Sequence, residues 1–325
     1  MMGLLVDGLW KDQGYDMRPA KGRFVRKDAA FRNWITPDGA PGLSGIGGFK
    51  AEPGRYHLYI SAACPWAHRT RIYRALKGLD TMVSMSVTHW FMGAEGWTFE
   101  HGDGVVPDPI NGAQRMFEIY QAADPSYTGR VTVPVLWDRE TKTIVNNESS
   151  EIIRMFNSAF DGIGAKIGDY YPEAHRDEID VLNARIYDTL NNGVYKSGFA
   201  ATQEAYEEAV LPLFETLDWL EERLARQRYL VGDALTEADW RLFPTLVRFD
   251  PVYVGHFKCN LRRLIDYPNL WAYTRELYQW PSVRETVNFE HIKRHYYESH
   301  TSINPFSIVP LGPILDFDTP HDRGR

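Results

Sequence analysis

Apolar positions in the first half of the chain follow two alternating spacings. Short β-favouring runs, such as residues 55–60, are followed by stretches in which apolar residues return every three or four positions. The first such stretch places Ile72, Tyr73 and Leu76 on one side of a predicted helix. Continued along the chain, the alternation predicts the order β-α-β-α-β-β-α, with strands at 55–60, 81–91, 131–137 and 142–145 and helices at 70–79, 111–123 and from 147 onward.

The second half of the chain has helical spacing almost throughout. It begins after a glycine-rich stretch at residues 162–172. Residues 177–190 and 206–224 each gather apolar side chains on one helix face. Thr236 and Asp239 have the spacing of a capping box, which marks a helix start. Further helices are expected at 269–279 and 291–300, and four prolines favour an extended tail over 301–325.

These patterns divide the chain into three parts. The first is rich in glycine, proline and charge, with scattered aromatic residues that include Trp10 and Trp34. We therefore expect an extended N-terminal segment over residues 1–54, an α/β domain over 55–165, and an all-helical domain with an extended tail over 173–325.

The third predicted strand contains a proline. Pro134 lies inside residues 131–137, and a central strand does not ordinarily accept proline because the residue cannot donate to the ladder. A cis bond between Val133 and Pro134 would turn the backbone at the start of the strand and resolve the conflict.

Cys64 lies where a predicted strand passes into a predicted helix. Pro65 follows it and suits the first helical turn, which needs no amide hydrogen there. Cysteines at helix starts have pKa values lowered from ~8.5 to roughly 3.5 to 7.5, because the helix dipole favours the thiolate. Cys64 is therefore the first candidate nucleophile. The alternative is a small buried hydrophobic residue, the common role of a lone cysteine.

The spacing around Cys64 excludes a two-cysteine redox motif. Residue 67, three positions on, is alanine, and the chain has one other cysteine, Cys259, in a stretch with no activating feature. The sequence therefore favours a redox cycle that uses one protein thiol together with an external thiol.

Ser149 offers a second candidate site at a predicted helix start. The amides at that start, together with the hydroxyl of Ser149, could bind a carboxylate. Serine at this position is also common merely as a cap, so both readings stay open.

Composition and charge exclude several classes of protein. The formal charge of -7 argues against a general nucleic-acid surface. Two cysteines are too few for a disulfide framework or a cysteine-rich zinc site, and they fit a reducing compartment. No stretch approaches the ~20 apolar residues that span a bilayer, and the start lacks a signal-peptide pattern. We expect a cytoplasmic protein that binds neither nucleic acid nor membranes.

Three histidines need to be weighed as candidate ligands or catalysts. His291 and His295 are four residues apart, but no third metal ligand is placed with them, so a solvated helix face is favoured and no metal is expected. His68 lies one turn after Cys64 and could assist it, although packing or capping is the favoured role.

The combined features resemble the glutathione transferase superfamily. The run Cys64-Pro65-Trp66-Ala67-His68-Arg69, the aromatic-rich N-terminal segment and residues 291–297 are similar to the glutathionyl-hydroquinone reductases, or xi-class transferases. The resemblance implies a thioredoxin-like α/β domain joined to an all-α domain, glutathione as co-substrate, and a homodimer.

The resemblance also implies roles for individual residues. Cys64 would be the nucleophile, and the backbone of Val133 would pair with the cysteinyl part of glutathione. Glu148 would bind the ammonium and Ser149 the carboxylate of the γ-glutamyl end. Four further positions complete the site that the family implies: Trp97 and Arg130 lining glutathione, and Tyr195 and Tyr296 facing an aromatic ring.

The implied reaction is reductive removal of glutathione from glutathionyl-hydroquinones. Attack by Cys64 on the glutathione sulfur would give a mixed disulfide, which a second glutathione would reduce. Two alternatives stay open: an omega-like cysteine transferase that reduces dehydroascorbate or mixed disulfides, and a transferase-like module that binds without catalysis.

Overall fold

The computed structural model describes residues 3–324 of the chain. Within these residues the chain separates into two compact units. The first unit holds residues 3–14, Asp28–Gly168 and Glu285–Ser307, and the second holds Tyr15–Lys27, Asp169–Arg284 and residues 308–324. This grouping differs from the expected boundaries, since parts of the N-terminal and C-terminal segments belong to each unit.

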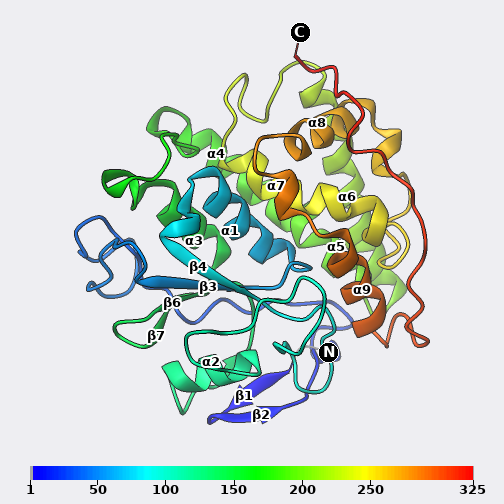
Figure 1. The fold of residues 1–325 in the computed structure, drawn as a ribbon. Coiled ribbons are helices and arrows are strands. Elements are labelled where there is room, and N and C mark those ends of the chain that lie inside the picture. Colours follow the sequence, from blue (N-terminus) through cyan, green and yellow to red (C-terminus); the bar gives the residue numbers. More distant parts are fainter. Residues whose placement is uncertain (1–2, 325) are drawn as a thin grey trace. The chain divides into compact units, whose positions relative to one another are not determined.

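A four-stranded mixed sheet forms the centre of the first unit (Figure 1). Its strands are β3 (Tyr56–Ile60), β4 (Val83–Val87), β6 (Val135–Asp138) and β7 (Thr143–Asn146), in the order β4-β3-β6-β7. β3 is parallel to β4 and antiparallel to β6, which is antiparallel to β7. Every residue of β3 is buried, as expected for a strand covered on both faces.

Three helices accompany this sheet. They are α1 (Pro65–Leu76), α2 (Met116–Ala123) and α3 (Ser149–Ser158). Figure 1 shows α1 and α3 on one side of the sheet and α2 on the other, and α1 packs against α3. The predicted order β-α-β-α-β-β-α is confirmed.

The helix expected over 111–123 begins five residues later than predicted. The carboxylate of Asp108 accepts hydrogen bonds from the backbone amides of Ile110, Asn111 and Ala113, at 2.9 to 3.3 Å. These bonds offer the backbone an alternative to helix, so α2 starts only at Met116.

The bond between Val133 and Pro134 is cis, as predicted. β6 begins at Val135, directly after the proline. The proline therefore lies outside the ladder, where its missing amide hydrogen costs nothing.

The N-terminal segment contributes two strands to a second small sheet, which its sequence was not expected to form. β1 (Leu4–Val6), β2 (Leu9–Lys11) and β5 (Gly129–Arg130) pair in the order β2-β1-β5, where an extended segment alone was expected. Asp7 and Gly8 link β1 to β2, with φ of 47° and 75°. Positive φ at both turn residues is typical of a tight hairpin.

In the described residues of the second unit, the regular secondary structure is helical. The helices are α4 (Arg176–Ile186), α5 (Gly193–Gly198), α6 (Gln203–Leu224), α7 (Glu237–Arg248) and α8 (Pro268–Tyr278). The predicted capping box at Thr236 and Asp239 starts α7, with the amide of Thr236 donating to Asp239 at 2.7 Å. The helix expected to reach residue 190 ends at Ile186 and continues as a π-helical turn, Tyr187–Asn191.

The last helix, α9 (Phe289–Ser299), belongs to the first unit. The described part of the tail beyond residue 304 forms neither helix nor strand. Between residues 3 and 324, no helix has both the length and the apolar character needed to cross a membrane.

Candidate active site

Cys64 is the N-cap of α1 and is partly exposed. Its backbone is extended, with φ of -74° and ψ of 122°, and Pro65 takes the first helical position. The carbonyl of Cys64 already accepts a helical hydrogen bond from the amide of His68 at 2.9 Å. The first turn of α1 carries no acidic residue, so the helix dipole there is not opposed by a negative side chain of its own turn.

The sulfur of Cys64 lies beside the cis-proline turn. Its Sγ is 3.6 Å from the carbonyl oxygen of Val133, the residue before cis Pro134. The strand-to-helix junction and the strand start that we predicted separately therefore meet at one point. A thiol at this point has a backbone carbonyl within contact distance and one side open to solvent.

Glu148 and Ser149 lie at the start of α3. Glu148 is the N-cap, and its Oε1 accepts hydrogen bonds from the amide of Ser150 at 2.9 Å and from its hydroxyl at 2.8 Å. Ser149 is the first helical residue and is buried. The reading of Ser149 as a mere cap is wrong, because Glu148 caps this helix.

Trp97 is buried in the loop between β4 and α2. Its indole is 3% exposed and stacks on the ring of His295 of α9, with centroids 4.6 Å apart and planes at 26°. Among residues 3–324, nothing accepts a hydrogen bond from its Nε1. A buried donor without an acceptor is costly, and a bound ligand could supply the acceptor.

Arg130 lies in β5 and holds the N-terminal segment. Its Nη2 donates to the carbonyl of Gly14 at 2.8 Å, and its Nη1 donates to the carbonyl of Gln13. The guanidinium therefore fastens the chain that follows β2.

The two tyrosines expected to face an aromatic ring belong to different units. Tyr296 of α9 lies in the first unit, is 1% exposed and has its ring edge-on to His295 and His300. Tyr195 of α5 lies in the second unit, where the guanidinium of Arg26 is 5.1 Å from its ring centroid.

The prediction of a solvated face for His291 and His295 is wrong. His291 is fully buried with Nε2 2.6 Å from the carbonyl oxygen of Asp103, and His295 is 6% exposed with Nδ1 2.8 Å from that of Trp90. Burial lowers the pKa of His291, which favours its neutral form. Within residues 3–324, no group of three side chains is arranged to hold a metal ion.

His68 and Cys259 occupy packed surroundings. The Nε2 of His68 is 2.8 Å from the hydroxyl of Thr286 in the buried interior of the first unit. Burial raises the pKa of the Cys259 thiol to about 12, and the side chain is 0% exposed. A thiol in such surroundings is a poor nucleophile.

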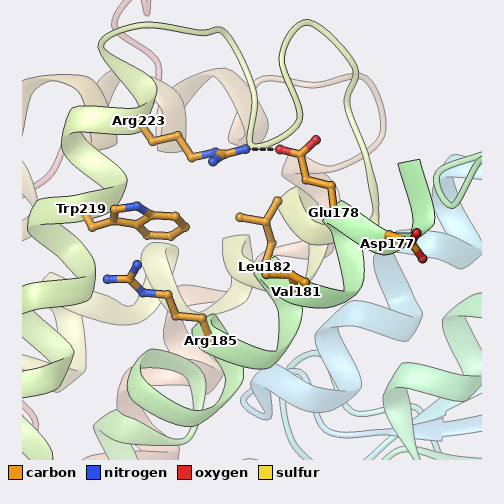
Figure 2. A pocket seen from close by; sticks show the side chains of 7 residues that line it. All are labelled: Asp177, Glu178, Val181, Leu182, Arg185, Trp219 and Arg223. Atoms are coloured by element: carbon orange, nitrogen blue, oxygen red, sulfur yellow. Dashed lines mark hydrogen bonds and ion pairs between the residues drawn. The ribbon is translucent and has the colours of Figure 1, made fainter. Parts of the chain in front are cut away.

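The second unit has a cavity of about 380 Å³ between α4 and α6 (Figure 2). Figure 2 shows Trp219 facing Leu182, with Arg185 on one side of the indole and Arg223 bonded to Glu178 on the other. None of the residues implied by the family resemblance lines this cavity.

The first unit thus gathers seven of the eight expected site residues. Cys64 and Val133 are in contact, and Glu148 and Ser149 are adjacent at one helix start. Sequence reasoning missed His295 as the partner of Trp97. The four-residue spacing from His291 marked a shared helix face, but it did not show that this face is buried. The seven are Cys64, Trp97, Arg130, Val133, Glu148, Ser149 and Tyr296.

Two protein-family models match the chain. The model described as "Glutathione S-transferase, N-terminal domain" matches residues 63–159, and the model described as "Glutathione S-transferase, C-terminal domain" matches residues 203–276. The first match includes the Cys64 junction and the start of α3. The α/β domain and the all-helical domain expected from the sequence are confirmed as this family's architecture.

Curated relatives and solved structures narrow the match. The chain is 61% identical to glutathionyl-hydroquinone reductase PcpF of Sphingobium chlorophenolicum over 96% of each chain, and 57% identical to glutathionyl-hydroquinone reductase YqjG of Escherichia coli over 99% of this chain and 98% of that one. The glutathione-bound structure of YqjG superposes with a TM-score of 0.92, at 55% identity over 99% of both chains. A xi-class transferase from Natrialba magadii gives a TM-score of 0.90 at 46% identity, over 99% of this chain and 96% of that one. The chain therefore belongs to the glutathione S-transferase family, within the xi-class branch that contains the glutathionyl-hydroquinone reductases.

Proposed function

We propose that the protein is a glutathionyl-hydroquinone reductase that uses glutathione as its reducing co-substrate. The observation that carries the proposal is the position of Cys64 at the start of α1, partly exposed, with Sγ 3.6 Å from the carbonyl of Val133 before the cis proline. The relatives at 61% and 57% identity, both named as such reductases, support the same activity.

We assign glutathione binding to the part of the first unit that holds Cys64 and Val133. The backbone of Val133 pairs with the cysteinyl residue of the tripeptide. Glu148 and Ser149 bind the ammonium and carboxylate of its γ-glutamyl end, which the amides at the start of α3 also favour. Trp97 and Arg130 line the same site, and the Nε1 of Trp97, which lacks an acceptor among the described residues, supports this role.

The first chemical step is attack of the Cys64 thiolate on the sulfur of the glutathionyl group. A bond forms between the two sulfurs, and the bond from sulfur to the ring carbon breaks. The electron pair of that bond goes to the ring, which takes up a proton and leaves as the hydroquinone. The ring carbon is reduced by two electrons, and the two sulfurs become a mixed disulfide.

The second step restores Cys64. A glutathione thiolate attacks the glutathionyl sulfur of the mixed disulfide, which releases oxidised glutathione and the Cys64 thiolate. The sum converts one glutathionyl-hydroquinone and one glutathione into one hydroquinone and one oxidised glutathione, with no other oxidant or reductant.

Tyr195 and Tyr296 are assigned to the ring of the substrate. The bond from sulfur to the ring carbon breaks readily only when the ring can accept the electron pair of that bond. Phenol groups that donate hydrogen bonds to the ring oxygens favour the keto tautomer, which can accept this pair. General acid help of this kind is typically worth 10²- to 10⁴-fold. Wild-type turnover by both Tyr195→Phe and Tyr296→Phe would remove this role.

The activity is tested by steady-state turnover of a glutathionyl-hydroquinone. Cys64→Ser should lose turnover, because the serine hydroxyl is not an effective nucleophile toward sulfur. Cys259→Ser is the matched control and should keep wild-type turnover, since Cys259 is buried with a raised pKa. Full turnover by Cys64→Ser would end the proposal.

A second candidate is an omega-like cysteine transferase that reduces dehydroascorbate or mixed disulfides. A relative from Schizosaccharomyces pombe, 48% identical over 92% of this chain, is named glutathione S-transferase omega-like 2. The two activities share the Cys64 thiolate and differ in the electrophile. Turnover of dehydroascorbate above that of the glutathionyl-hydroquinone would favour this second candidate.

Assembly and location complete the proposal. We propose a homodimer, as the resemblance to the family implies, and light scattering of the purified protein at several concentrations tests it. A cytoplasmic location is supported by the two-cysteine composition, which suits a reducing compartment. Fractionation of cells that express the tagged chain tests the location.

A further inference from the structure

Residues 285–300 lie outside both stretches that the family models match, yet they belong to the same unit as Cys64. We call them the α9 segment, because they comprise α9 and the turn before it. Their contacts reach two parts of the proposed glutathione site, namely the helix that carries Cys64 and the loop that carries Trp97.

The beginning of the α9 segment is bonded to the Cys64 helix. The hydroxyl of Thr286 is 2.8 Å from Nε2 of His68, one turn after Cys64. Arg71 donates from its two Nη atoms to the carbonyls of Thr286 and Glu285, both at 3.1 Å. His68 and Thr286 are both buried, so solvent does not compete for this bond.

The helix itself is bonded to the loop around Trp97. The indole of Trp90 donates to Oε2 of Glu298 at 3.0 Å, and the amide of Met92 donates to the hydroxyl of Ser299 at 3.0 Å. Farther along the loop, the Nε2 of His291 lies within hydrogen-bonding distance, 2.6 Å, of the carbonyl oxygen of Asp103. The loop is therefore held on both sides of Trp97.

His295 is the member of the α9 segment whose ring stacks on Trp97. The stacked rings have centroids 4.6 Å apart at 26°, and both side chains are buried. The Nδ1 of His295 is 2.8 Å from the carbonyl of Trp90, which can only accept, so Nδ1 carries the proton. This bond satisfies the buried Nδ1–H, while the stacked ring itself holds the face of the indole.

We propose that His295 is a positioning residue that holds the indole of Trp97 so that its buried Nε1–H meets an acceptor of bound glutathione. The inference rests on the proposed function, in which Trp97 lines the glutathione site. The acceptor is a carbonyl or carboxylate oxygen, the two acceptor types that the tripeptide carries. The α9 segment thereby forms a functional part of the proposed glutathione site, whose other assigned residues lie within 63–159.

The test compares glutathione affinity in variants of the full chain, measured by calorimetry with reduced glutathione. His295→Gln keeps a donor for the carbonyl of Trp90 but removes the ring. His295→Phe keeps the ring and removes the donor. His291→Gln is the matched control, because His291 lies one turn away on the same helix and also bonds a loop carbonyl, while its ring packs edge-on to Trp90.

The expected pattern follows from the stacked rings. His295→Gln should raise the dissociation constant about two- to tenfold, the range that an aromatic pair contributes. His295→Phe and His291→Gln should stay within about twofold of the wild type. Retained affinity in His295→Phe also shows that the fold survives a change at this position. Equal losses in the two glutamine variants, or a loss in His295→Phe as large as in His295→Gln, would overturn the inference.

Variants of Trp97 separate this inference from the proposed function. Trp97→Phe should weaken glutathione binding, and His295→Gln should add nothing further in that background, because the histidine acts through the indole. If Trp97→Phe weakens binding and His295→Gln does not, the inference alone fails. If Trp97→Phe binds like the wild type, the glutathione role of Trp97 fails, and the inference fails with it.

Discussion

At the scale of single residues, the two cysteines show how surroundings decide chemistry. Cys64 is partly exposed at a helix start, where the dipole favours a thiolate. Cys259 is fully buried, and that burial raises the pKa of its thiol to about 12 because a thiolate there would lose its hydration. The sequence context of each, a strand-to-helix junction for one and no activating feature for the other, already pointed this way.

Alkylation should distinguish the two thiols in the folded protein. Iodoacetamide at pH 7 should modify Cys64 and leave Cys259 unmodified, since the reagent needs a thiolate that it can reach. Intact mass and peptide mapping measure the site, and Cys64→Ser should take up no label until the protein is denatured. Labelling of native Cys259 at a rate comparable to Cys64 would contradict the account.

Ser149 should contribute directly to glutathione affinity. Replacing it with alanine removes a hydroxyl assigned to a carboxylate, and a hydrogen bond to a charged group is worth about 1.5 to 3 kcal/mol. The dissociation constant for glutathione should therefore rise by roughly ten- to a hundredfold in calorimetry. Ser158→Ala, at the exposed end of the same helix, is the control. An unchanged constant in Ser149→Ala would exclude Ser149 from the site.

At the scale of elements, Arg130 connects a two-residue strand to the N-terminal segment. It donates to the carbonyls of Gln13 and Gly14, just after the hairpin of β1 and β2. The same residue is expected to line the glutathione site. The proposed site and the chain just after the hairpin therefore share one guanidinium.

Loss of this guanidinium should loosen the chain near residue 14. Arg130→Met removes two hydrogen bonds worth about 1 kcal/mol each, so limited proteolysis within residues 11–16 should speed up by about tenfold or more. Arg18→Met serves as control, because among residues 3–324 the exposed side chain of Arg18 pairs with exposed Asp16 alone. Mass spectrometry of the fragments measures the rate and the site of cleavage. Equal cleavage rates for Arg130→Met and the wild type would show that other contacts hold the segment.

Local sequence predicted the elements whose determinants lie within a few residues. The order of strands and helices around the sheet, the cis bond before Pro134 and the capping box of α7 were all readable in this way. The hairpin at Asp7 and Gly8 was also readable from its turn pair, and we missed it. The late start of α2 was not, because it depends on which amides the carboxylate of Asp108 bonds in the folded loop.

In the whole molecule, the chain separates into two units, and the sequence did not predict which segments join which unit. The sequence predicts a helix near residues 291–300, but it does not show what that helix packs against. The burial of His291 and His295 is a tertiary property of the same kind, and it reversed our expectation of a solvated face.

Each unit also carries a buried histidine that couples its stability to pH. Burial lowers the pKa of His57 in the first unit and of His256 in the second to about 4, against 6.5 for an exposed histidine. The unfolded chain therefore binds protons at pH values where the folded chain does not. Below pH 6.5 this favours unfolding, and each histidine removes roughly 3 kcal/mol of stability by pH 4.

Urea unfolding as a function of pH tests this coupling. The free energy of unfolding should fall as pH drops from 7 to 4, with part of the slope due to each histidine. His57→Gln can keep hydrogen bonds to the hydroxyls of Ser84 and Ser86, which lie 2.6 and 2.9 Å from the imidazole nitrogens. That variant should lose about one proton's worth of the slope. A slope identical to the wild type would show that His57 titrates normally in the fold.

The proposed mechanism requires the Cys64 sulfur to accept the glutathionyl group, and a single-turnover experiment detects this transfer. Wild-type protein is mixed with one equivalent of a glutathionyl-hydroquinone and no added glutathione, then analysed by intact mass, peptide mapping and chromatography of the released ring. One glutathionyl group should appear on Cys64 for each hydroquinone released, and it should leave as oxidised glutathione once glutathione is added. Release of hydroquinone with Cys64 unmodified would contradict this mechanism.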